Sequence, residues 1–124
     1  MIDMSFITHL LEVLDQIKIH HWQTKCYARH IATDNLYSKL AELTDEFVEV
    51  YIYQERPVLK EGEKNIRITN MTDEEGYDYL LDFALWLKED LKKIVDDSNS
   101  ISLNHILEEM SSLVNQTLYL FTFK

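Results

Sequence analysis

Glycine, proline and cysteine are scarce in this chain of 124 residues, which has two glycines, one proline and one cysteine. Because glycine and proline interrupt helices, their scarcity beside abundant leucine, glutamate, lysine and alanine favours an all-helical protein. The lone cysteine, Cys26, cannot form an internal disulfide, which is typical of a reducing compartment. We therefore expect a cytoplasmic protein.

Basic residues are also in the minority, with 12 lysines and arginines against 22 aspartates and glutamates and a formal net charge of −10. This charge argues against a nucleic-acid backbone as partner and fits a soluble protein or one that attracts cations. The sequence lacks the roughly 18 uninterrupted apolar residues that a membrane span needs. Asp3 and the lack of a basic segment before an apolar stretch predict no signal peptide.

The apolar residues follow a helical period. The length predicts a single domain over residues 1–124, with one core. The period predicts four helices, over about residues 5–27, 29 or 33 to 56, 72–96, and 102 onward. Pro57 is expected to end the second helix, and Thr72 and Glu75 to open the third as a capping box.

Residues 57–71, between the second and third helices, show no helical period. At about 3.3 Å per residue, this connection can run the length of a bundle of about 30 Å. One long crossover between the second and third helices, with short links elsewhere, is the connectivity of ferritin-like proteins. The predicted fold is therefore an all-α, ferritin-like four-helix bundle.

Imidazole and carboxylate side chains form one stripe on the second helix. His30 and Asp34 are four residues apart near its start, and Asp45 and Glu49 are four apart further along. The residues from Asp34 to Asp45 turn through about 1100°, within roughly 20° of three full turns, so the four side chains share a face. About half a turn away lie the residues expected to face the core: Leu36, Leu40, Leu43, Phe47 and Val50.

The stripe also has apolar neighbours, which are Tyr37, Ala41, Val48 and Ile52. A helix that is apolar on two sides usually has a second surface to bury, so we expect this face to meet another subunit. Asp34 and Asp45 are about 16 Å apart along the helix, whereas metal ligands lie about 2–2.5 Å from their ion. One chain cannot close a site with both ends of the stripe, but two copies packed antiparallel about a two-fold axis can. The mixed imidazole and carboxylate set suits iron, manganese or zinc.

The Dps miniferritins (DNA-binding proteins from starved cells) have a ferroxidase motif that this chain resembles in three pieces: His21-Trp22, His30-x3-Asp34-x2-Tyr37 and Asp45-x3-Glu49. The resemblance implies an iron site between two-fold-related subunits. One chain would supply His21, His30 and Asp34, and the other Asp45 and Glu49.

The same resemblance implies oxidation of Fe(II) by peroxide or dioxygen and storage of Fe(III). It implies a homo-oligomer that is at least a two-fold dimer and that forms a dodecameric cage in the family. The chain lacks the Lys-rich arm that some members use on DNA, so we expect no binding to nucleic acid.

Simpler interpretations stay open for these residues. His21 continues the inner stripe of the first helix and would then be a histidine at the core edge with a satisfied hydrogen bond, while His20 is expected to face solvent. The acidic residues of the second helix would be a solvated face, and Cys26 would not be a ligand. The alternative function is a non-enzymatic, ferritin-like structural or assembly protein with a degenerate metal site.

Overall fold

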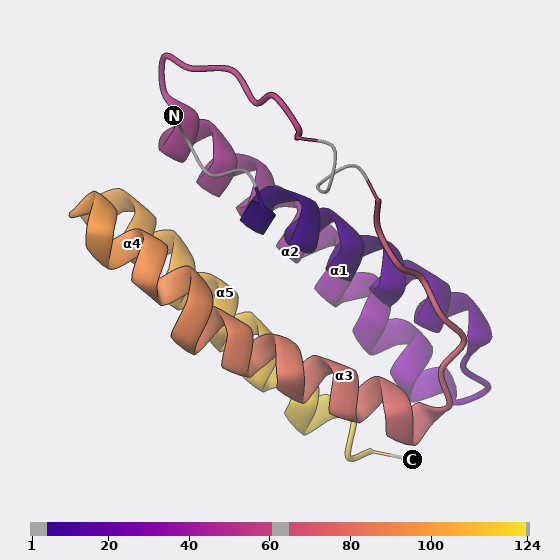
Figure 1. The fold of residues 1–124 in the computed structure, drawn as a ribbon. Helices are drawn as coiled ribbons and strands as arrows, with labels where there is room; N and C mark the ends of the chain where they lie inside the picture. The colour runs from indigo at the N-terminus through magenta and orange to yellow at the C-terminus, as the bar shows by residue number, and fades with distance from the viewer. Residues whose placement is uncertain (1–4, 61–64, 124) are drawn as a thin grey trace.

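The computed structural model describes residues 5–60 and 65–123 (Figure 1). Two long helices come first, α1 (Ser5–Gln23) and α2 (Tyr27–Ile52). A second helical stretch consists of α3 (Asp73–Trp86), the π-helical turn η2 (Leu87–Leu91) and α4 (Lys92–Ser98), and it is followed by α5 (Ile101–Leu120). The prediction of an all-helical four-helix bundle is confirmed for the residues that the structure describes.

The helices form two antiparallel pairs (Figure 1). One pair is α1 with α2, and the other is the α3–α4 stretch with α5; α2 packs against α5 between the pairs. Because α2 and α3 run in the same direction, the chain must return along the bundle between them. The described parts of this return are residues 53–60 and 65–72, and the sequence predicted a long connection over residues 57–71.

Polar side chains of α1 hold the last part of this connection, which runs as an extended segment along the bundle (Figure 1). Alternate backbone N–H groups of the segment donate to carboxylate and amide oxygens of α1: Arg67 to Glu12, Thr69 to Gln16 and Met71 to Gln23. Gln16 also donates its side-chain amide to the Thr69 carbonyl at 2.8 Å. Both polar groups of the Thr69 backbone are therefore satisfied by one side chain.

Helix α2 ends at Ile52, four residues before the boundary near Arg56 that the sequence predicted. Tyr53 has a positive φ of 49° and a 72% exposed side chain. Pro57 prevents a helix from continuing through it and disfavours helix at the residue before it, so it does not by itself explain an end at Ile52. Residues 53–60 are all exposed, so no core contact supports another turn. Val50, which was expected in the core, is 40% exposed, and Phe47 is the last fully buried residue of α2.

The start of α3 agrees with the prediction. Thr72 Oγ1 accepts a hydrogen bond from the Glu75 N–H at 3.2 Å, and the Thr72 N–H donates to the Glu75 carboxylate at 2.9 Å. These two bonds form a capping box, which satisfies backbone donors that the first turn of a helix leaves free.

The core side of α3 and α4 differs in part from the prediction. The buried apolar side chains of this stretch are Leu80, Phe83, Leu87, Leu91 and Val95. The helical period of the apolar residues also predicts Leu81 and Leu85 on the core side of this stretch, but these two side chains are 43% and 50% exposed. The sequence pattern missed this because the buried stripe runs through Phe83 and then through the π-helical turn, which presents both of its leucines to the core.

Within residues 5–60 and 65–123, no helix is both long enough and apolar enough to cross a bilayer.

Candidate metal site

His21 and His30 lie together at the turn between α1 and α2. Their rings are stacked, with centroids 3.8 Å apart and planes 17° from parallel. Each ring contacts the backbone of the other residue: His21 Nδ1 lies 2.8 Å from the His30 carbonyl oxygen, and His30 Nδ1 lies 2.9 Å from the His21 carbonyl oxygen. The fold therefore brings two of the predicted ligands side by side.

These contacts determine which ring nitrogen carries the proton. A carbonyl oxygen can only accept a hydrogen bond, so each Nδ1 must be an N–H group. In a neutral ring the lone pair then lies on Nε2, and an imidazole whose other nitrogen donates to a carbonyl is the usual arrangement of a metal-binding histidine. His21 is also only 8% exposed, so the same contacts satisfy the simpler interpretation of a histidine at the core edge.

The stacking limits what the pair can bind. Imidazole lone pairs lie in the ring plane, and those of two nearly parallel rings do not converge on one ion that is about 2.1 Å from each nitrogen. In this conformation, His21 and His30 suit two neighbouring ions better than a single one.

The three predicted carboxylate ligands, Asp34, Asp45 and Glu49, are exposed along α2. In the part of one chain that the structure describes, no group of three or more histidine, cysteine, aspartate and glutamate side chains is placed to hold a metal ion. The structure of a single chain thus joins the two histidines and leaves the carboxylates apart. The complete ligand set stays a prediction about a contact between two chains.

The apolar strip beside the carboxylates packs inside the chain. Its members are partly buried against the chain's own core: Tyr37, Ala41, Val48 and Ile52. The ring of Tyr37 is also covered by the Lys18 ammonium group, which lies 4.3 Å from the ring centroid. The strip therefore does not by itself require a second subunit. A second subunit is expected because the predicted ligands are separated along α2.

His20, which was expected to face solvent, is only 3% exposed. Its imidazole lies against Gly76 of α3, where an added Cβ atom would come closer than 3.0 Å to three atoms of the ring. A glycine inside a helix costs about 1 kcal/mol relative to alanine, so it often has a packing reason. Gly76 was the one signal in the sequence that could have predicted a large side chain from another helix at this place.

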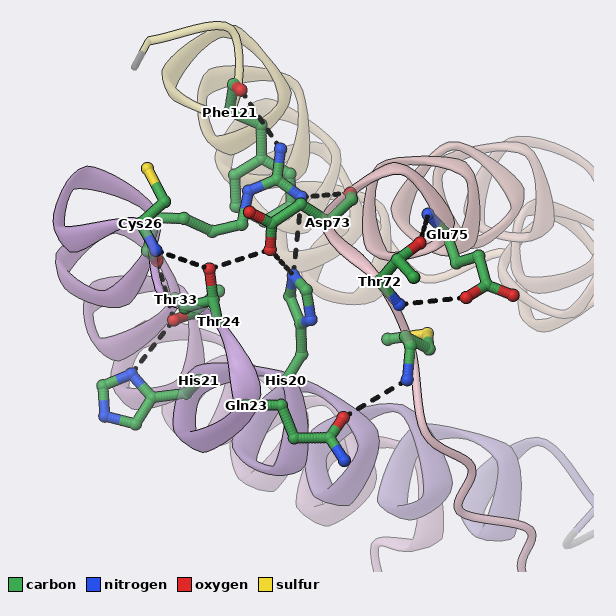
Figure 2. A network of polar contacts seen from close by, with 12 residues as sticks. His20, His21, Gln23, Thr24, Cys26, Thr33, Thr72, Asp73, Glu75 and Phe121 are labelled. Atoms are coloured by element: carbon green, nitrogen blue, oxygen red, sulfur yellow. Dashed lines mark hydrogen bonds and ion pairs between the residues drawn. The ribbon is translucent and has the colours of Figure 1, made fainter.

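Arg29 joins the helix ends around His20 and is 7% exposed. Its guanidinium donates to the Asp73 carbonyl and, at 3.2 Å, to the Phe121 carbonyl, and it lies 4.0 Å from the centroid of the Phe121 ring. Figure 2 shows His20, Thr24 and Asp73 facing one another within this network. Thr24 Oγ1 donates to Asp73 Oδ1 at 2.8 Å.

His20 Nε2 is 3.4 Å from Arg29 Nη1 and 3.8 Å from Asp73 Oδ1. Burial lowers the pKa of His20, the Arg29 charge lowers it further, and the Asp73 charge opposes both. The neutral imidazole is therefore the form that fits this site. The sequence did not reveal the network, because its members come from four separate segments of the chain.

The turn with the two histidines and the helix ends joined by Arg29 lie within a match to a protein-family model. That model is DUF5856, a family of unknown function, and it matches residues 21–121. The chain belongs to the DUF5856 family. The DUF5856 match includes the five predicted ligands, as well as Arg29 and Gly76. No curated protein and no solved structure matches the chain significantly.

Proposed function

We propose that this protein binds Fe(II) between two copies of the chain and promotes its oxidation by peroxide or dioxygen, in the manner of a ferritin-like miniferritin. The observation that carries the proposal is the pair formed by His21 and His30. In this pair, each Nδ1 donates a hydrogen bond to the backbone carbonyl of the other histidine. This leaves two Nε2 lone pairs at the end of a helix whose exposed face carries carboxylates. The single long connection between α2 and α3 supports a ferritin-like fold.

The proposed site divides its ligands between the copies. One chain supplies His21, His30 and Asp34, and Asp34 shares a face of α2 with His30, one turn further on. The other chain supplies Asp45 and Glu49. Imidazole and carboxylate ligands together suit iron, and a parallel pair of histidines suits two ions.

The chemistry is a transfer of electrons from iron to the oxidant. Two Fe(II) ions each give one electron to hydrogen peroxide, the O–O bond breaks, and two protons complete two water molecules. With dioxygen, four Fe(II) ions and four protons are consumed for two water molecules. The Fe(III) produced would leave the site for a mineral core if the copies assemble into a cage.

Iron titration tests the activity. Fe(II) is added to the protein under anaerobic conditions, peroxide follows, and ferric absorbance is compared with that of buffer alone. We expect a faster and larger ferric signal with protein, which Asp45→Ala should remove. Asp82→Ala, which removes an exposed carboxylate on α3, is the control and should behave like the wild type. A wild-type signal no larger than that of buffer would refute the proposal.

Mixing two inactive variants tests the shared site. The double variant His30→Ala, Asp34→Ala keeps the distal carboxylates, and the double variant Asp45→Ala, Glu49→Ala keeps the histidine end. A mixed dimer of the two contains one complete site, so dissociation and reassembly of the mixture should restore part of the activity. A site inside one chain would give no recovery.

A non-enzymatic structural role is the second candidate, and the burial of the apolar strip of α2 favours it. Because Tyr37, Ala41, Val48 and Ile52 already pack on the core of their own chain, the exposed carboxylates of α2 can be a solvated face. This candidate predicts that the wild-type protein is folded and that its affinity for Fe(II) is no higher than that of the Asp45→Ala variant.

A further inference from the structure

A small void lies inside the bundle where α1, α2, α3 and the end of the long connection meet. It offers about 10 Å³ to a water-sized sphere, and its lining includes His20 of α1 and Tyr79 of α3. A single buried water molecule needs about this much room, so anything larger is excluded.

Two polar atoms from the lining of this void have no hydrogen-bond partner. They are His20 Nδ1 and the Tyr79 hydroxyl oxygen, and both are fully shielded from solvent. Buried polar groups almost always have a partner in the protein or an ordered water. Both unpartnered atoms belong to residues that line this one void, which is the size of a water molecule.

The state of His20 follows from its other nitrogen. Nε2 lies 3.4 Å from Arg29 Nη1, and a guanidinium can only donate, so Nε2 accepts and Nδ1 carries the proton. Burial raises the pKa of Tyr79, so its hydroxyl is neutral and can both donate and accept. The lining of the void therefore includes one hydrogen-bond donor, His20 Nδ1–H, and one group that can donate or accept, the Tyr79 hydroxyl. A single water molecule can satisfy both.

We propose that one ordered water molecule binds in this void and bridges His20 Nδ1–H to the Tyr79 hydroxyl. The water accepts from the imidazole and donates to, or accepts from, the phenol. It links α1 to α3 at the point where His20 also contacts Gly76. By holding the proton on Nδ1, it keeps Nε2 free to accept from Arg29. This site is independent of the proposed iron chemistry.

The NMR spectrum of the wild-type protein tests the site directly. A long-range ¹H–¹⁵N spectrum at neutral pH should show the Nδ1–H tautomer of His20. A rotating-frame cross-relaxation experiment should give a contact between that proton and a long-lived water. A crystal structure should show one density peak within hydrogen-bond distance of both atoms. A dry void, or a direct bond between His20 and Tyr79, would overturn the proposal.

Substitution of the phenol provides the second test. Tyr79→Phe removes one partner of the water and leaves the ring in place, so the cross-relaxation peak should be lost or reduced severalfold. Tyr77→Phe, a partly buried tyrosine on the same helix, is the matched control and should leave the peak unchanged. An unchanged peak in Tyr79→Phe would show that the phenol does not hold the water. If that variant does not fold, the wild-type spectrum and density decide the matter.

Discussion

At the scale of single residues, the contact between His20 of α1 and position 76 of α3 requires glycine at that position. The His20 ring occupies the space that a Cβ atom of Gly76 would take, so α3 approaches α1 closely only with glycine at that position. The pattern of α1 assigned His20 to the surface because it sits next to, and not on, the apolar stripe. Its burial depends on a partner far away in the sequence.

We expect Gly76→Ala to destabilise the protein. In an open helix interior this change would stabilise by about 1 kcal/mol. Here the new methyl group must displace a buried ring, and overpacking costs about 1–3 kcal/mol. A net loss of up to about 2 kcal/mol should appear as a lower midpoint of urea unfolding. Ser38→Ala, on the exposed face of α2, should change stability by less than about 0.5 kcal/mol. A gain in stability from Gly76→Ala would contradict this packing.

The two histidines of the candidate site were predicted only in part. The resemblance to the Dps ferroxidase motif placed His21 and His30 in one predicted site. Their stacking and the reciprocal bonds from Nδ1 to the backbone could not be foreseen, since these depend on the conformation of the turn between α1 and α2. That conformation determines which nitrogen of each ring, Nε2, would be left for the proposed metal.

At the scale of single elements, the start of α3 is a local structure, and the sequence predicted it correctly. Thr72→Ala should cost about 0.5–2 kcal/mol in the free energy of unfolding, because the Glu75 N–H loses its cap. Thermal unfolding at neutral pH measures the loss. Thr122→Ala, near the exposed carboxyl end of the described chain, should have a smaller effect.

The capping box also predicts a dependence on pH. Hydrogen bonds from the backbone and side chain of Thr72 lower the pKa of Glu75 from its ordinary 4.5. A lowered folded pKa means that the bond contributes stability above pH 4.5 and that this contribution is lost as the pH falls through the folded value. Glu75→Gln should therefore flatten the loss of stability in acid relative to the wild type. Glu74→Gln, outside the box, should leave the acid profile unchanged, and a matching change in both variants would contradict the assignment.

The end of the long connection is held by α1 side chains and not by a helix or strand of its own. In Gln16→Leu, the buried volume is kept, but the Thr69 backbone loses two hydrogen bonds. Each is worth about 0.5–1.5 kcal/mol, so exchange of the Thr69 amide hydrogen should accelerate roughly ten- to a hundredfold. Gln116→Leu, on the exposed side of α5, serves as the control. Unchanged exchange at Thr69 would show that the segment is held by other contacts.

At the scale of the whole molecule, the proposed function requires two copies of the chain. If Fe(II) is held between them, free Fe(II) at about a hundred times its Kd should favour the dimer by about 2.7 kcal/mol for each site that it fills. Anaerobic sedimentation velocity should show a dimer fraction that rises with Fe(II) and falls when a chelator is added. The double variant Asp45→Asn, Glu49→Gln should give no such response. A wild-type chain that stays monomeric at every Fe(II) concentration would exclude the shared site.

The sequence by itself determined the local features of this protein: its helical class, the approximate helix limits, the long connection and the cap at Thr72. Each of these depends on residues within a few positions of one another, whose spacing and propensities can be read directly. Only the tertiary structure decided the burial of His20, its close packing on Gly76 and the hydrogen bonds that Arg29 donates to the Asp73 and Phe121 carbonyls. The hydrogen bonds of Arg29 reach residues 44 and 92 positions away, and no local pattern encodes which distant backbone will stand beside a given side chain once the helices pack.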